Sequence, residues 1–115
     1  MQMSSAYKEG VFELQRGDAL IAAKKFNEAE LLYPQSVWAP KSALMAAYAY
    51  YSQNYFTDSI FELERYLEIY PNHKDLVYAY FLLGMSFYEQ IVDEKKDINP
   101  MLKSKKYFEI VMNRF

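Results

Sequence analysis

Few residues of this chain have the chemistry that catalysis needs. The sequence has one histidine, His73, one threonine, no cysteine and no glycine-rich phosphate-binding motif. A nucleophile with its base, or a metal with its ligands, needs several such side chains close together, and a chain without cysteine forms no disulfide or thiolate zinc site. His73 follows Asn72 where a helix is expected to begin, which favours a structural polar role over a metal ligand or pH switch. We therefore expect no enzyme activity, no catalytic or metal-binding residue and no cofactor.

The charged residues do not indicate a polyanionic partner. The net charge is −2 and the isoelectric point is about 5.4, whereas a general nucleic-acid binder needs a dense basic surface. Four charged residues of the stretch 62–68 could form an acidic site, but a solvated helix face with weak pairing between neighbouring turns is favoured. They are Glu62, Glu64, Arg65 and Glu68. Three lysines between positions 103 and 106 also favour a solvent face, with anionic lipid or an acidic partner as the alternative. We expect no nucleic-acid partner.

Aromatic side chains are the unusual part of the composition. They make up 18% of the 115 residues, with 12 tyrosines and 8 phenylalanines, which is about twice ordinary usage. Only 3 glycines and 4 prolines are present, too few for a turn-rich β fold, so we expect helices in a single domain. No apolar run is long enough for a signal peptide or a membrane span. Tyrosine at this density fills space between helices and offers contact surface to a partner.

An internal repeat organises these helices. Tyr33-Pro34 recurs 37 residues later as Tyr70-Pro71, and the stretches before both pairs follow the tetratricopeptide pattern of two helices closed by proline. The sequence therefore predicts an all-α, tetratricopeptide-repeat helical-hairpin solenoid of about three repeats, at about 5–34, 37–71 and 74–115. The six helices are expected at about 5–16, 18–32, 37–52, 55–69, 74–92 and 100–114.

Small residues at repeat positions let the paired helices approach closely. The predicted contacts place Gly10, Ala47 and Gly84 opposite Ala22, Ser59 and Ser104.

Turns and breaks follow from glycine, asparagine and proline. Gly17 and Asn54 are predicted to make the turns inside the first two hairpins, and Pro40 is tolerable only in the first turn of a helix. Asn72 is a candidate N-cap for the fifth helix. The charged stretch 91–100 is predicted to be a solvated loop, with a partner contact as the alternative. By the repeat register a closing proline is due at position 116, so we expect a fragment of a longer repeat protein.

The first helix of each hairpin is expected to line a concave face. Its lining residues would be Tyr7, Val11, Leu14, Met45, Tyr48, Tyr51, Phe81, Met85 and Tyr88. An aromatic and methionine lining suits an extended peptide, and we favour this over a pure packing stripe. The repeats that clamp a terminal carboxylate use lysine and asparagine at places that here hold Tyr7, Val11, Met45, Tyr78 and Leu82, so this subclass is disfavoured. The predicted peptide-binding residues are Tyr48, Tyr51, Phe81, Met85 and Tyr88.

Several segments together resemble one known family. They are Tyr7, Leu14 and Gly17, then Ala39-Pro40-Lys41, then Tyr70-Pro71-Asn72-His73, and then Leu83-Gly84-Met85-Ser86. Over essentially the whole chain they resemble the N-terminal half of the BamD family, tetratricopeptide lipoproteins of the outer-membrane β-barrel assembly machinery. The proline-asparagine-histidine corner and the insertion after the fifth helix are the most specific features.

This resemblance implies a non-catalytic periplasmic scaffold at the outer membrane of a Gram-negative bacterium. Its partners would be the C-terminal, aromatic-ended targeting segments of unfolded outer-membrane proteins. A β-barrel assembly subunit would dock on downstream repeats absent here. A lipid anchor upstream of Met1 would be the only membrane attachment, so the chain itself is expected to be soluble. The alternatives are the periplasmic tetratricopeptide family that coordinates envelope constriction with peptidoglycan synthesis, which keeps a tight turn in place of 91–100, or a purely structural spacer.

Overall fold

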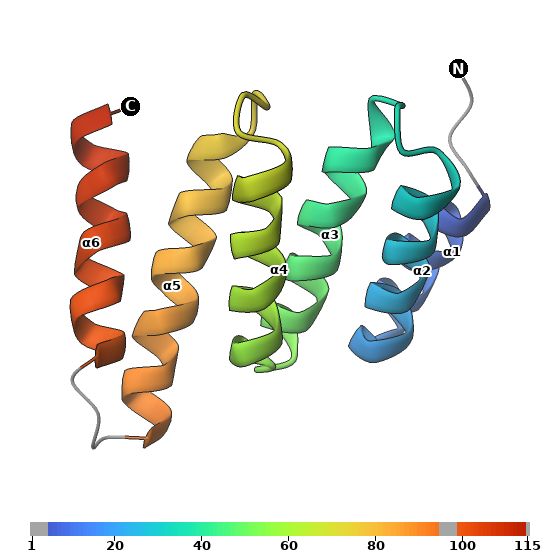
Figure 1. Ribbon diagram of the computed structural model, residues 1–115. Helices are drawn as coiled ribbons and strands as arrows, with labels where there is room; N and C mark the ends of the chain where they lie inside the picture. Colours follow the sequence, from blue (N-terminus) through green and yellow to red (C-terminus); the bar gives the residue numbers. More distant parts are fainter. Residues whose placement is uncertain (1–4, 95–98, 115) are drawn as a thin grey trace.

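The computed structural model describes residues 5–94 and 99–114, and over this part of the chain it contains helices and no strand (Figure 1). The helices are α1 (Ser5–Arg16), α2 (Ala19–Leu32), α3 (Trp38–Ser52), α4 (Phe56–Ile69), α5 (Leu76–Glu94) and α6 (Asn99–Arg114). Each predicted helix is present within a few residues of its expected bounds, which confirms the all-α helical-repeat fold. The predicted loop 91–100 is shorter than expected, because α5 continues to Glu94 and α6 begins at Asn99; residues 95–98 lie outside the described residues.

The helices pack in chain order as a row of antiparallel neighbours, with extents of 43 × 30 × 17 Å (Figure 1). Each helix contacts the next, and α3 also contacts α5. The first helices of the second and third hairpins therefore meet directly, so residues far apart in sequence can share one surface.

Turn residues behave largely as their chemistry predicts. Gly17 has φ 88° and Asn54 has φ 68°, the left-handed region that glycine and asparagine tolerate best. Asp18 caps α2, accepting a hydrogen bond from the Ile21 N–H at 3.2 Å. Pro40 is the third residue of α3, where its missing N–H costs no intrahelical hydrogen bond.

The predicted N-cap of the fifth helix is wrong. Helix α5 begins at Leu76, and the Ala79 N–H donates to the Asp75 carbonyl at 3.1 Å, so Asp75 holds the N-cap position. Asn72 lies in the preceding turn. A turn therefore separates Pro71 from α5, and the N-cap position lies three residues later than predicted.

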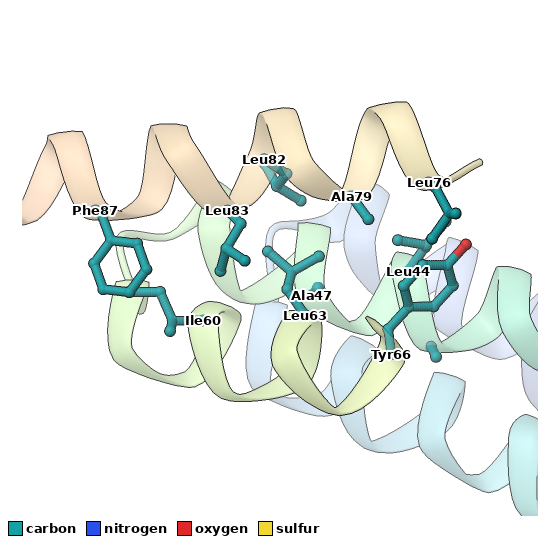
Figure 2. Close-up of a cluster of buried hydrophobic side chains, with 11 residues drawn as sticks. Leu44, Ala47, Ile60, Leu63, Tyr66, Leu76, Ala79, Leu82, Leu83 and Phe87 are labelled. Atoms are coloured by element: carbon teal, nitrogen blue, oxygen red, sulfur yellow. The ribbon is translucent and has the colours of Figure 1, made fainter. Parts of the chain in front are cut away.

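Two hydrophobic clusters make the core. The first joins α1, α2 and α3 around Tyr7 and Phe26, and the second joins α3, α4 and α5 around Leu63 and Tyr66. Figure 2 shows side chains of α5 pointing from one side toward those of α3 and α4 in the second cluster. The core is thus built between successive hairpins as well as within them, as stacking repeats require.

Glycine and phenylalanine are matched across two of the hairpins. A Cβ added to Gly10 would lie 2.8 Å from the ring of Phe26, and one added to Gly84 would lie 2.7 Å from the ring of Phe108. In the second hairpin the corresponding small residue is Ala47. The residue that corresponds to Phe26 in the second hairpin is Leu63, 37 positions later. Alanine is larger than glycine and leucine is smaller than phenylalanine, so the two changes offset each other. The predicted close approach of paired helices is confirmed at Gly10 and Gly84.

Replacing Gly10 by alanine is expected to lower the free energy of unfolding by about 1–2 kcal/mol, because the overpacking cost exceeds the gain in helix propensity. Adding Phe26→Leu recreates the alanine–leucine pairing of the second hairpin. The double variant should be more stable than the sum of the two single changes by about 1 kcal/mol. Urea denaturation of the four proteins measures this coupling, and strict additivity would contradict the packing argument.

Charged residues tie the first two hairpins together. The Arg65 guanidinium donates to both carboxylate oxygens of Glu30, at 2.7 and 3.1 Å, and to Glu62 at 3.0 Å. The Tyr70 hydroxyl also donates to Glu30. The hydrogen bond to Glu30 is the main reason that the pKa of Arg65 is raised.

The expectation of a solvated face over 62–68 is therefore wrong for Glu62 and Arg65, although Glu64 and Glu68 are exposed. The reason is Glu30, which approaches from α2 in the preceding hairpin.

Candidate peptide-binding surface

The structure separates the predicted peptide-binding residues into two groups. Tyr48 is exposed on α3, whereas Tyr51 is half-buried against the second core cluster, with its ring edge-on to Phe56 at 5.5 Å. On α5, Phe81 and Tyr88 are exposed and Met85 is half-buried.

Three tyrosines from α3 and α5 form one such surface. Burial raises the pKa of Tyr78 to about 12, and the phenols of Tyr48 and Tyr51 add to this increase because they lie close enough for their charges to repel. Burial also raises the pKa of Tyr51, and the nearby Glu89 and Tyr48 add to the increase. We call Tyr48, Tyr51 and Tyr78 the tyrosine cluster. Met85 lies two helical turns after Tyr78, so it extends the same side of α5.

Tyr78 is the member of the tyrosine cluster that is not among the predicted peptide-binding residues. In the sequence it stands at a position where a carboxylate-clamping repeat would carry a polar residue. The signal that could have found it is the contact between α3 and α5, which brings Tyr78 to residues 27 and 30 positions earlier in the chain. Such a contact depends on how one hairpin seats on the next.

Phe81 and Tyr88 share one stripe of α5 with Met85, at spacings of four and three residues, but they hold positions that the following hairpin covers in the earlier repeats. They stand 37 residues after Leu44 and Tyr51, and Leu44 is buried in the cluster that α5 covers. Phe81 instead lies beside Phe108 of α6, with ring centroids 6.1 Å apart. These two aromatics therefore occupy the side of the third hairpin that is covered, in the earlier hairpins, by the hairpin that follows.

Tyr7, near the other end of the chain, also occupies a position that the following hairpin covers. The expectation that Tyr7 lines a concave face is wrong, because it is only 5% exposed, while Phe81 at the repeat-equivalent position is 47% exposed. The rings of Phe26 and Trp38 pack on Tyr7 at 5.2 and 5.1 Å. Trp38 comes from the next hairpin, and in the described residues no later hairpin covers Phe81.

His73 has the structural role expected of it. Its Nδ1 lies 2.6 Å from the hydroxyl of Tyr66 and accepts a weaker hydrogen bond from the Asp75 N–H at 3.4 Å. Tyr66 is fully buried, so this contact joins the α4–α5 turn to the core. Among the described residues, no group of three or more histidine or acidic side chains is placed to hold a metal ion.

Comparison with known proteins agrees with the arrangement of helices and turns. A family described as YfiO, outer membrane lipoprotein, matches residues 1–115. The chain belongs to this family. The BamD resemblance seen in the sequence is thereby confirmed, and the relatives below carry the name outer membrane protein assembly factor BamD.

Three of these relatives indicate how far the likeness extends. A protein of Caulobacter vibrioides is 35% identical over 91 residues, covering 79% of this chain and 30% of the relative. A protein of Rickettsia prowazekii is 27% identical over 113 residues, covering 98% and 45%. A protein of Neisseria gonorrhoeae is 30% identical over 84 residues, covering 73% and 32%. The chain therefore spans less than half the length of these BamD relatives.

None of the helices in the described part of the chain is both long and apolar enough to cross a membrane.

The tyrosine cluster makes a prediction about alkaline pH. Because the pKa of Tyr78 is about 12 in the folded protein and 10.0 unperturbed, the unfolded chain loses this proton first as pH rises. Stability from this group is therefore fully present below pH 10 and is lost between pH 10 and 12. The absorbance difference between wild type and Tyr78→Phe should show a phenol that titrates near pH 12. A midpoint near pH 10 would contradict the buried contact with Tyr48 and Tyr51.

Proposed function

We propose that this chain is the client-binding part of a non-catalytic periplasmic scaffold for outer-membrane protein assembly in a Gram-negative bacterium. Its three hairpins, at about 5–34, 37–71 and 74–115, would act as one tetratricopeptide-repeat domain. The clients are unfolded outer-membrane proteins, held by their C-terminal targeting segments. Membership of the outer membrane lipoprotein family and the name of the BamD relatives support this assignment.

The observation that carries the proposal is the tyrosine cluster on adjacent first helices. Tyr48 and Tyr78 are 39% and 41% exposed although their phenols lie close together, so both side chains offer part of their surface to a partner. Rigid aromatic rings supply contact area at low entropic cost, and tyrosine hydroxyls can hydrogen-bond to an extended backbone. Met85 adds a side chain that adapts to different client residues. This surface suits an extended segment with aromatic side chains.

The other parts of the machinery would attach outside this surface. A β-barrel assembly subunit would dock on a part of the longer relatives that this chain does not cover. The parent protein would be held at the periplasmic face of the outer membrane by a lipid anchor. The client segment would then be held near the subunit that folds it.

The experiment is binding of labelled peptides that match the C-terminal segments of barrel proteins, measured by fluorescence anisotropy. We expect saturable binding, and removal of the last aromatic residue should weaken it by about tenfold or more. A scrambled peptide of the same composition is the control. Equal binding of all three peptides, or no binding, would reject the client-binding role and favour a purely structural spacer.

A further inference from the structure

A second surface feature lies at the edge of the stack where the hairpins join. The turn between α2 and α3 and the turn between α4 and α5 are on the same edge, at the top of Figure 1. A cleft of about 680 Å³ opens between them. Its lining residues are Val37, Trp38, Pro40, Lys41, Asn72, His73, Lys74 and Asp75.

One side of this cleft is apolar and the other is polar. Val37, Trp38 and Pro40 come from the start of α3, and Val37 is 75% exposed. The Lys41 ammonium lies 5.1 Å from the centroid of the Trp38 ring. A ligand in the cleft would therefore meet an aromatic surface and a cation side by side.

The polar side offers hydrogen-bond donors. Since Nδ1 of His73 accepts the Asp75 N–H, the proton of the neutral imidazole is on Nε2, and the Tyr66 hydroxyl donates to Nδ1. His73 Nε2 is then a donor fixed in orientation by a buried phenol. Within the described part of the chain, neither Lys41 nor Lys74 is in an ion pair.

The charges favour an anion. Two lysines outnumber the one carboxylate of the lining, which belongs to Asp75. Asp75 Oδ2 lies 3.9 Å from His73 Nδ1, on the histidine nitrogen that is already engaged. A carboxylate attached to an apolar group would satisfy the lysines and the histidine donor while covering Trp38.

The cleft is continuous with the tyrosine cluster. Lys41, Met45 and Tyr48 follow one another at four and three residues on α3, a spacing that places them on the same side of a helix. Lys74 lies just before α5, about one turn ahead of Tyr78. Lys41 and Tyr48 are about 10 Å apart along the axis, which about three residues of extended peptide would span.

We propose that this cleft binds the C-terminal end of a peptide, with the free α-carboxylate at Lys41, Lys74 and His73 and the last, apolar side chain on Trp38 and Val37. The inference rests on the proposed function for the identity of the peptide, and it adds the location of its end. The preceding residues then run over the tyrosine cluster. Lysines at the cleft and Glu89 beside Tyr51 at the other end give the surface a charge gradient that orients the peptide.

The test uses one client peptide as the free acid, as the C-terminal amide, and as the free acid with alanine in place of the last aromatic residue. Trp38 is the only tryptophan, so its fluorescence reports directly on the cleft. We expect the free acid to change this fluorescence and to bind about tenfold more tightly than the amide. The Lys41→Gln/Lys74→Gln variant should bind the free acid and the amide with equal affinity.

A matched control is Lys8→Gln/Lys24→Gln, which removes the same charge from exposed positions on α1 and α2 and should keep the preference for the acid. Equal binding of acid and amide to wild type, with continued dependence on the last aromatic residue, would overturn the cleft proposal and leave the proposed function intact. Absence of any peptide binding would overturn both. A Trp38 response to phosphatidylglycerol vesicles but not to peptide would assign the cleft to a membrane surface and overturn the proposal.

Discussion

Replacing Arg65 by methionine is expected to lower the free energy of unfolding by about 2–4 kcal/mol. The change leaves the Glu30 and Glu62 carboxylates, whose side chains are 9% and 10% exposed, without their cation. Losing one partner of a fully buried pair costs about 3–5 kcal/mol, and the 29% exposure of the Arg65 side chain reduces this cost. Urea or thermal denaturation followed by circular dichroism measures the loss.

The control for Arg65 is Arg16→Met. Arg16 also pairs with a glutamate, Glu13 at 3.4 Å, but its side chain is 62% exposed. An exposed pair of this kind contributes at most about 1 kcal/mol, so the control should unfold almost like wild type. If Arg65→Met is no more destabilised than Arg16→Met, the charged contacts do not hold the first two hairpins together.

Replacing Tyr48 and Tyr78 together by alanine is expected to weaken client-peptide binding by about 2–3 kcal/mol, or roughly 30-fold or more. Both side chains are about two-fifths exposed, so helicity should be retained. Tyr51 is left unchanged because it packs on the second core cluster, and its loss would confuse binding with folding. Fluorescence anisotropy gives the affinity, and circular dichroism gives the helix content of the same samples.

The comparison variant is Phe81→Ala/Tyr88→Ala, which removes the two predicted binding aromatics of α5 that lie outside the tyrosine cluster. Since α6 lies beside Phe81, this pair should leave peptide affinity within about twofold of wild type. If it weakens binding more than the Tyr48 and Tyr78 pair does, the client lies on the end of the stack and the tyrosine cluster is only a packing feature. An unfolded Tyr48/Tyr78 variant would show that these rings are core.

The helices of this chain were predictable because their limits are local. Gly17 and Asn54 adopt the left-handed backbone that ends one helix before the next begins, and the Tyr-Pro pairs stop α2 and α4. Short segments, above all the Tyr70-Pro71-Asn72-His73 corner and the insertion after the fifth helix, point to the BamD family. Each of these sequence features is shorter than one hairpin, so it can be recognised without knowing how the hairpins pack.

The proposed client-binding surface was only partly visible in the sequence. Spacing selects Tyr48, Tyr51 and Met85, but it does not show that Tyr78 lies near Tyr48 and Tyr51, or that Phe81 lies beside Phe108 of α6. Spacing along one helix gives a residue's direction relative to that helix alone. It does not say which neighbouring helix lies in that direction.

What the sequence by itself determined is the set of helices, their order and the family; what only the tertiary structure decided is which side chains are covered. Tyr7 and Phe81 hold equivalent repeat positions, yet one is core and the other exposed, because burial in a stack depends on the following hairpin. Glu30 pairs with Arg65, which lies 35 residues later in the chain. Lys41 and His73 line the same cleft although they follow different turns between hairpins. The physical reason is that in a solenoid each hairpin is partly buried by the next one. The contacts between hairpins therefore cannot be read from the hydrophobic periodicity of either hairpin alone.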